Sequence, residues 1–169
     1  MIKRIFDIFF SAIGLLLLSP FFLLVAILIK INSRGPVFYW QERIGKNGKP
    51  FKMIKFRTMK VDSDSKGLLT IGGRDSRVTG MGYYLRKFKI DELPQLINVF
   101  LGDMSFVGPR PEVKKYVDLY NKEQMEVLSV RPGITDYASI EYRDESTLLA
   151  ESGNPEEFYI STVMPAKLK

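Results

Sequence analysis

The pattern of apolar positions separates an apolar N-terminal segment from a mixed remainder. Residues 8–29 form a run without any charged side chain, as long as the roughly 20 residues that cross a bilayer. The run is apolar on all sides, so it lacks the single apolar face of a helix that covers a soluble core. It therefore predicts a membrane helix.

Two features of this run favour a helix that enters the membrane and returns to the same side. Ser19-Pro20 lies at its centre, and proline removes a backbone donor and kinks or breaks a helix. Positive charge favours the cytoplasmic side, and basic residues flank both ends: Lys3, Arg4, Lys30 and Arg34. We expect a re-entrant helix over residues 1–33, in which Ser19 or other partners bond the carbonyls freed at the bend. A spanning helix with a proline kink remains the alternative.

Residues 34–169 are expected to form a cytoplasmic domain at the membrane surface. Segments 37–44 and 51–58 have strand composition, and the glycine-containing segment 45–48 between them predicts a β-hairpin. Segment 62–77 is polar and contains glycine, which indicates a loop. The remainder after residue 133 is expected to form short helices and loops.

Helical patterns follow the hairpin. We expect helices over 82–88, 91–101 and 111–128, of which 91–101 has apolar residues three and four positions apart and ends at Gly102. These helices are amphipathic enough to lie on a membrane surface. The predicted class is α+β and mostly helical, with a small hairpin and an N-terminal re-entrant membrane helix broken at Ser-Pro.

Composition narrows the chemistry. The chain has neither cysteine nor histidine, which excludes thiolate nucleophiles, Cys/His zinc sites and a histidine general base. Its net charge of +6 is uneven: the basic excess falls in residues 30–60, next to the apolar segment. That placement suits an anionic membrane surface or a phosphorylated substrate.

Asp91-Glu92 is the central candidate for catalysis. Adjacent carboxylates can hold a divalent cation, and one of them can act as a covalent nucleophile. A carboxylate with a pKa near about 4 is already ionised at neutral pH, so it needs no general base. Asp and Glu at a helix start are also ordinary capping residues. From the dipeptide alone, capping and catalysis both stay open.

Cationic side chains surround this pair in the sequence. Arg86, Lys87 and Lys89 precede it. Lys55 and Arg57 alternate along the second strand and so share a face. Arg110 follows in the rigid loop 106–111 and is suited to bidentate phosphate contacts. Such cations would reduce the repulsion between an anionic nucleophile and a diphosphate.

The motifs, taken together and in order, resemble the monotopic phosphoglycosyl transferases, the bacterial sugar transferase family. The resemblance covers roughly residues 3–135. The matching segments are KRIFD at 3–7, Ser19-Pro20, KFRTM at 55–59, DELPQ at 91–95, GDMSFVGPRP at 102–111 and RPGIT at 131–135. The chain departs from many members at 136–138, where it has Asp-Tyr-Ala in place of Gly-Trp-Ala. Members also usually continue beyond residues 165–167, and larger ones carry further N-terminal membrane helices.

The resemblance implies an enzyme of the bacterial cytoplasmic (inner) membrane, with its active site on the cytoplasmic face. Membrane lipids would be among its partners. Asp91 would attack a UDP-sugar, release UMP and form a covalent phosphoglycosyl-aspartyl enzyme, and polyprenol phosphate would accept the sugar phosphate. Mg²⁺ would lie at Asp91 and Glu92. The implied substrate-binding residues are Lys55, Arg57, Arg86, Pro109, Arg110 and Pro111.

Two alternatives remain. The first is a non-enzymatic, membrane-tethered protein that binds anionic lipid or nucleic acid through its basic strands. It gives no reason for Asp91-Glu92 beside arginines. The second is a phosphohydrolase that uses Asp91 and water, for which the sequence offers no obvious water-activating base. The transferase is preferred, and it requires no nucleic-acid partner.

Overall fold

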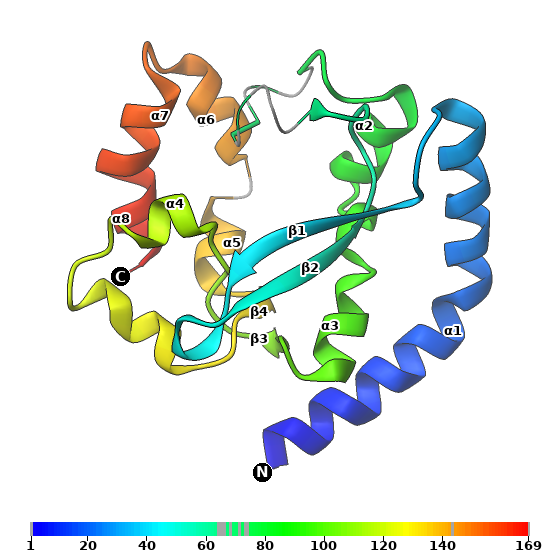
Figure 1. Cartoon of the computed structure of the whole chain (residues 1–169), viewed down its shortest axis with the longest axis horizontal. Coiled ribbons are helices and arrows are strands. Elements are labelled where there is room, and N and C mark those ends of the chain that lie inside the picture. Colours follow the sequence, from blue (N-terminus) through cyan, green and yellow to red (C-terminus); the bar gives the residue numbers. More distant parts are fainter. Residues whose placement is uncertain are drawn as a thin grey trace. The chain divides into compact units, whose positions relative to one another are not determined.

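The structure is a computed structural model that describes residues 2–63, 67, 69–70, 72, 75–142 and 144–168. It is mostly helical, with one two-stranded sheet of β1 and β2 and another of β3 and β4 (Figure 1). The predicted α+β class with a small hairpin is confirmed. Parts of the predicted loop 62–77 lie outside the described residues.

The chain forms two compact units. The first unit comprises Met1–Gln41, Met53–Leu68 and Arg74–Gly102, and the second comprises Glu42–Lys52, Leu69–Gly73 and Asp103–Lys169. This division concerns packing. The boundary expected between residues 33 and 34 concerns membrane and cytoplasm, and it stays a prediction.

The first unit begins with α1 (Ile2–Asn32), which is one continuous helix with Pro20 inside it. The expected break at Ser-Pro is not an interruption of the helix, although Figure 1 shows that the helix axis changes direction along its length. Ser19 Oγ donates to the Leu16 carbonyl at 2.8 Å, which is the carbonyl that the missing N–H of Pro20 leaves unbonded. Ser19 thus has its expected role, while a return to the same membrane side stays a prediction.

Most of the apolar surface of α1 is exposed. The buried residues of this helix are Asp7, Ser11, Val25 and Ile29, whereas side chains such as Ile2 and Leu16 are 86% and 74% exposed. Its length and apolar composition are sufficient to cross a membrane. The predicted long apolar N-terminal helix is therefore confirmed, and its exposed surface suits contact with lipid.

The core of the first unit gathers around Phe56 at the end of β2. β1 (Phe38–Ile44) and β2 (Pro50–Phe56) form the predicted hairpin around η1 (Lys46–Gly48). Phe56 stacks on Phe38 and meets Phe22 edge-on. Val25, Ile29 and Leu85 complete the buried cluster. Burial of these side chains joins α1, the hairpin and α2 (Gly80–Lys87).

The segment predicted as one helix over 91–101 is divided. Ile90–Glu92 forms the short 3₁₀ helix η3, and α3 begins only at Gln95 and runs to Leu101. Pro94 lies at the N-cap position of α3. Backbone N–H groups at the start of a helix make no intrahelical hydrogen bond, so the missing N–H of proline costs nothing there. α3 packs on α1, and Gly102 ends it with a φ of 101° as expected.

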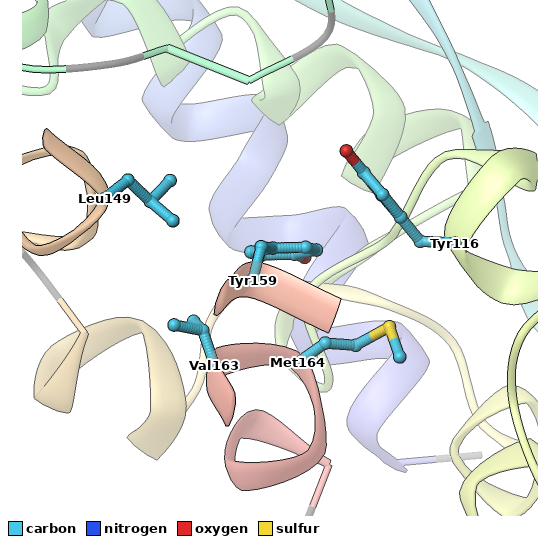
Figure 2. Close-up of a cluster of buried hydrophobic side chains, with 5 residues drawn as sticks. All are labelled: Tyr116, Leu149, Tyr159, Val163 and Met164. Carbon is cyan, nitrogen blue, oxygen red and sulfur yellow. The ribbon is translucent and has the colours of Figure 1, made fainter. Parts of the chain in front are cut away.

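The second unit has a core of aromatic and aliphatic side chains. Tyr116, Leu149, Tyr159, Val163 and Met164 are buried together, and Figure 2 shows the Tyr159 ring between Leu149 and Tyr116. Its helical elements are α4 (Lys114–Val117), η4 (Gln124–Ser129), α5 (Tyr137–Glu141), α6 (Glu145–Glu151), α7 (Pro155–Phe158), η5 (Tyr159–Val163) and α8 (Met164–Lys167).

The prediction of one helix over 111–128 is wrong. Glu112 is extended in an isolated bridge to Ile44, so helical structure starts only at Lys114. Asn121 and Gln124 then bond each other's backbone N–H groups through their side chains. This reciprocal capping starts a new helical turn and ends the continuous pattern.

Two short parallel strands, β3 (Ser105–Val107) and β4 (Gly133–Thr135), join two of the sequence motifs in the second unit. Gly108 and Gly133 meet backbone to backbone, and a Cβ on Gly133 would lie 2.1 Å from the Gly108 nitrogen. Both positions therefore require glycine. The sequence did not predict this sheet, because three-residue strands carry no periodic signal.

Candidate active site

Asp91 lies in the turn between α2 and α3, in the first unit. Lys89 adopts a left-handed conformation, with a φ of 57°, and reverses the chain after α2. The reversal places Asp91 in η3, where it is only 8% exposed. Its Oδ1 atom has no hydrogen-bond partner among the residues that the structure describes. A buried carboxylate oxygen without a donor is unusual and identifies a candidate site for chemistry.

Asp91 does not cap α3. That helix has Pro94 at its N-cap and no side-chain capping bond, and Asp91 precedes it by a full turn. The capping interpretation of Asp91, which the sequence left open, is therefore wrong for α3. The buried oxygen remains available to a ligand.

The charges around Asp91 oppose one another. Burial raises the pKa of Asp91 above its ordinary value, the neighbouring Lys55 lowers it, and Glu92 raises it. Arg86 and Lys89 lower it by smaller amounts. Three cations thus partly offset the desolvation of one carboxylate.

Lys55 connects the hairpin to the carboxylate pair. Its Nζ donates to Glu92 Oε1 at 3.2 Å, and both side chains are largely buried. The C-terminal half of β2 is bonded to α3 through the Ile54 N–H, which donates to Asn98 Oδ1 at 3.0 Å. Lys55 therefore acts on Asp91 and Glu92 from a fixed position.

Arg86 is positioned by the start of α2. Thr79 caps this helix through a bond from the Gly82 N–H at 3.0 Å, and Gly82 lies against the Thr58 carbonyl, where a Cβ would come within 2.0 Å. This close approach requires glycine. It holds α2 so that its last turn presents Arg86 close enough to act on the charge of Asp91.

Strand alternation predicted that Arg57 shares a face with Lys55, but its side chain contacts the chain that follows α1. It is 6% exposed, and its guanidinium donates to the carbonyls of Ser33, Arg34 and Pro36 at 3.0, 2.7 and 2.6 Å. Because β2 ends at Phe56, Arg57 turns to the chain that leaves α1. The structure gives it a role in closing the C-terminus of α1, and its role in phosphate binding stays a prediction.

Pro109, Arg110 and Pro111 belong to the second unit. There the Arg110 N–H donates to Asp136 Oδ2 at 2.9 Å, and Asp136 Oδ1 caps α5 by accepting from the Ser139 N–H at 2.6 Å. Asp136 therefore fixes the loop that carries Arg110. Sequence reasoning noted Asp136 only as a departure from the family pattern, although Asp before a short helix is a recognisable cap signal.

Asp91 and Glu92 are the carboxylates that the sequence proposed for a divalent cation. The described part of the chain has no cluster of three or more acidic side chains that could hold a metal ion. Mg²⁺ characteristically binds through one or two carboxylates and completes its shell with water and substrate phosphates. The pair, with its buried Oδ1 free of donors, fits that mode of binding.

The chain is similar to known proteins over most of its length. The model of the family described as bacterial sugar transferase matches residues 1–166. A Bacillus subtilis (strain 168) protein, named provisionally as an undecaprenyl-phosphate N-acetylgalactosaminyl 1-phosphate transferase, is 47% identical over 72% of this chain and 68% of its own. The exopolysaccharide production protein ExoY of Rhizobium meliloti (strain 1021) is 42% identical over 86% of this chain and 71% of its own.

A further relative is longer. The UDP-glucose:undecaprenyl-phosphate glucose-1-phosphate transferase of Escherichia coli (strain K12) is 41% identical over 94% of this chain, which spans 35% of that protein. The chain belongs to the bacterial sugar transferase family. It is an enzyme of the phosphoglycosyl transferase class. The family that the sequence motifs indicated is therefore confirmed, and the non-enzymatic alternative is not supported.

Proposed function

We propose that this enzyme transfers a sugar 1-phosphate from a UDP-sugar to polyprenol phosphate through a covalent intermediate on Asp91. The observation that carries the proposal is the buried Oδ1 of Asp91, which has no hydrogen-bond partner among the described residues and lies within the influence of Lys55, Arg86 and Lys89. The names of relatives that use undecaprenyl phosphate support the acceptor. The name of the Escherichia coli relative supports a UDP-sugar donor.

The proposed reaction has two displacements at phosphorus. Asp91 Oδ1 attacks the β-phosphorus of the UDP-sugar, the bond from that phosphorus to the bridging oxygen breaks, and UMP leaves with the electron pair. A phosphate oxygen of polyprenol phosphate then attacks the same phosphorus and the bond to Asp91 breaks. The products are UMP and a polyprenyl diphosphate sugar, and the carboxylate of Asp91 is restored. No general base is needed, because both nucleophiles are anions.

The residues around Asp91 have separate tasks in this proposal. Arg86 and Lys55 reduce the repulsion between the carboxylate and the incoming diphosphate. Glu92, held by Lys55, would bind Mg²⁺ together with Asp91. When bound, the metal supplies charge neutralisation at the phosphate oxygens. Pro109, Arg110 and Pro111 would border the nucleotide, with Asp136 holding their loop.

The membrane location follows from the acceptor and from α1. Polyprenol phosphate resides in a bilayer, and the exposed apolar surface of α1 gives the enzyme a way to reach it. We place α1 in the bacterial inner membrane and the carboxylate pair on the cytoplasmic face, where UDP-sugars are made.

Intact-protein mass spectrometry tests the nucleophile. After incubation with a series of UDP-sugars and Mg²⁺, but without polyprenol phosphate, the wild-type chain should gain the mass of one sugar phosphate, on Asp91. Asp91→Asn should gain none and should lose turnover. Asp118→Asn is the matched control, because Asp118 is an exposed partner of Lys114 in the second unit, and it should behave as wild type.

Full turnover by Asp91→Asn would falsify the assignment. An adduct on Glu92 in place of Asp91 would exchange the roles of the two carboxylates.

A further inference from the structure

Gln95 is a second buried polar side chain, four residues after Asp91 in the sequence. It is the first residue of α3 and is 1% exposed. Its Nε2 atom has no hydrogen-bond partner within the described structure. Gln95 closes the DELPQ motif, and neither the fold nor the proposed reaction has so far given it a role.

Asp91 lies in η3, and Gln95 begins α3 four residues later. Leu93 and Pro94 between them are both in right-handed helical conformation, and the Leu96 N–H donates to the Leu93 carbonyl at 3.1 Å, so the chain winds tightly from one side chain to the other. One presents a donor without an acceptor, and the other an acceptor without a donor. They nevertheless do not bond each other.

Two unsatisfied groups in one buried turn are costly. Each gives up its hydrogen bonds to water on folding and gains no protein partner in return. An apolar residue at position 95 would avoid one of these costs. A protein that keeps both groups is expected to use them for a ligand that bonds to the carboxylate and accepts a hydrogen bond from the amide.

We propose that the side-chain amide of Gln95 is a catalytic hydrogen-bond donor to the phosphoryl group that Asp91 attacks and then carries. This inference rests on the proposed function. When Asp91 Oδ1 bonds to phosphorus, the non-bridging phosphoryl oxygens lie beyond it, within reach of the side chain one turn later. Nε2–H donates to one of these oxygens as negative charge builds up on it. No proton is transferred, so Gln95 returns unchanged after each displacement.

This role differs from that of the cations. Lys55 and Arg86 act on Asp91 before and after substrate binds. A neutral amide adds no charge to the free site and acquires its partner only when phosphorus is present, so it stabilises the transition state more than the ground state. Loss of one such donor typically lowers kcat by about 100-fold or more.

Gln95→Met tests the inference, because methionine keeps the length of the side chain and removes the donor. We expect the rate of adduct formation and kcat to fall by about 100-fold, with little change in the KM for the UDP-sugar. We also expect the thermal midpoint to stay level or rise, because an unsatisfied buried donor has been removed. A structural glutamine would show the reverse, with a lower midpoint.

Gln124→Met is the matched control. Gln124 accepts from the Asn121 N–H in a surface turn of the second unit, so its replacement should leave kcat unchanged. The inference is overturned if Gln95→Met keeps wild-type kcat, or if its activity and thermal midpoint fall together. An inactive wild-type chain with every UDP-sugar would instead overturn the proposed function, so the two failures can be told apart.

Discussion

Asp91 combines burial, negative charge and an oxygen without a donor, and these properties oppose stability. Burial raises the pKa of Asp91, so the folded state binds its proton more tightly than the unfolded state does. The penalty is therefore absent below the unfolded pKa of about 4. It grows as the pH rises and is complete above the folded pKa. At neutral pH this raised pKa makes the fold less stable than it would be with a carboxyl of ordinary pKa.

Asp91→Asn should therefore be more stable than wild type at neutral pH while it is inactive. We expect a gain on the order of 1–2 kcal/mol, because burial costs the neutral amide of asparagine less solvation free energy than it costs a carboxylate. The gain should shrink as the pH is lowered and should vanish below about 4, where the wild-type carboxyl becomes protonated in the unfolded state as well. Thermal denaturation in detergent across this pH range measures it. A variant that is less stable than wild type at pH 7 would show that the carboxylate has a structural partner.

The sequence predicted the candidate site residues unevenly, and the reasons are physical. Asp91 and Glu92 were found because adjacent carboxylates followed a group of cations. Arg57 shows the limit of strand alternation, because the strand ends one residue earlier and its guanidinium turns to backbone carbonyls. Gln95 gave no signal of its own, since only burial without a partner distinguishes it from an ordinary helical glutamine.

Among the elements, α1 has arginine hydrogen bonds near both ends that connect it to distant parts of the first unit. Arg57 bonds the carbonyls that follow its C-terminus. Near its N-terminus, Arg4 donates to the Val99 and Phe100 carbonyls at the end of α3, at 2.5 and 2.8 Å. The apolar helix is thus attached to the first unit by arginine contacts to backbone as well as by packing.

Arg57→Met should destabilise the first unit. The change leaves the Ser33, Arg34 and Pro36 carbonyls without their donor, at a cost of about 2–3 kcal/mol. A lower thermal midpoint would demonstrate it. Arg34→Met is the control, because it removes a nearby positive charge and keeps the Arg34 carbonyl. An unchanged midpoint with a raised KM for the UDP-sugar would instead assign Arg57 to phosphate binding alone.

Elements with a strong local pattern were predicted, and elements set by distant contacts were not. The apolar run of α1 and the hairpin turn chemistry gave correct elements. The helix over 111–128 failed because Glu112 pairs with a strand far away in the sequence. The parallel pair β3 and β4 depends on two glycines that meet across a long separation. No sliding window of sequence contains that information.

At the scale of the whole molecule, the orientation of α1 decides which side of the membrane the enzyme occupies. The chain contains no cysteine, so Ile2→Cys and Arg34→Cys each introduce a single reactive group. We expect both positions to be labelled by an impermeant thiol reagent only after the cytoplasmic face has been exposed. Labelling of the two positions from opposite sides would establish a spanning helix and contradict the re-entrant one.

The backbone contact between Gly108 and Gly133 has a consequence for engineering. A new side chain at either glycine would collide with the other strand, and Asp136 bonds the Arg110 backbone beside them. Segments 105–110 and 131–136 therefore form one structural unit, although 20 residues separate them in the sequence. A chimera with another family member should exchange both segments together, because replacing only one would bring together two backbones whose side chains and conformations do not fit at this close contact.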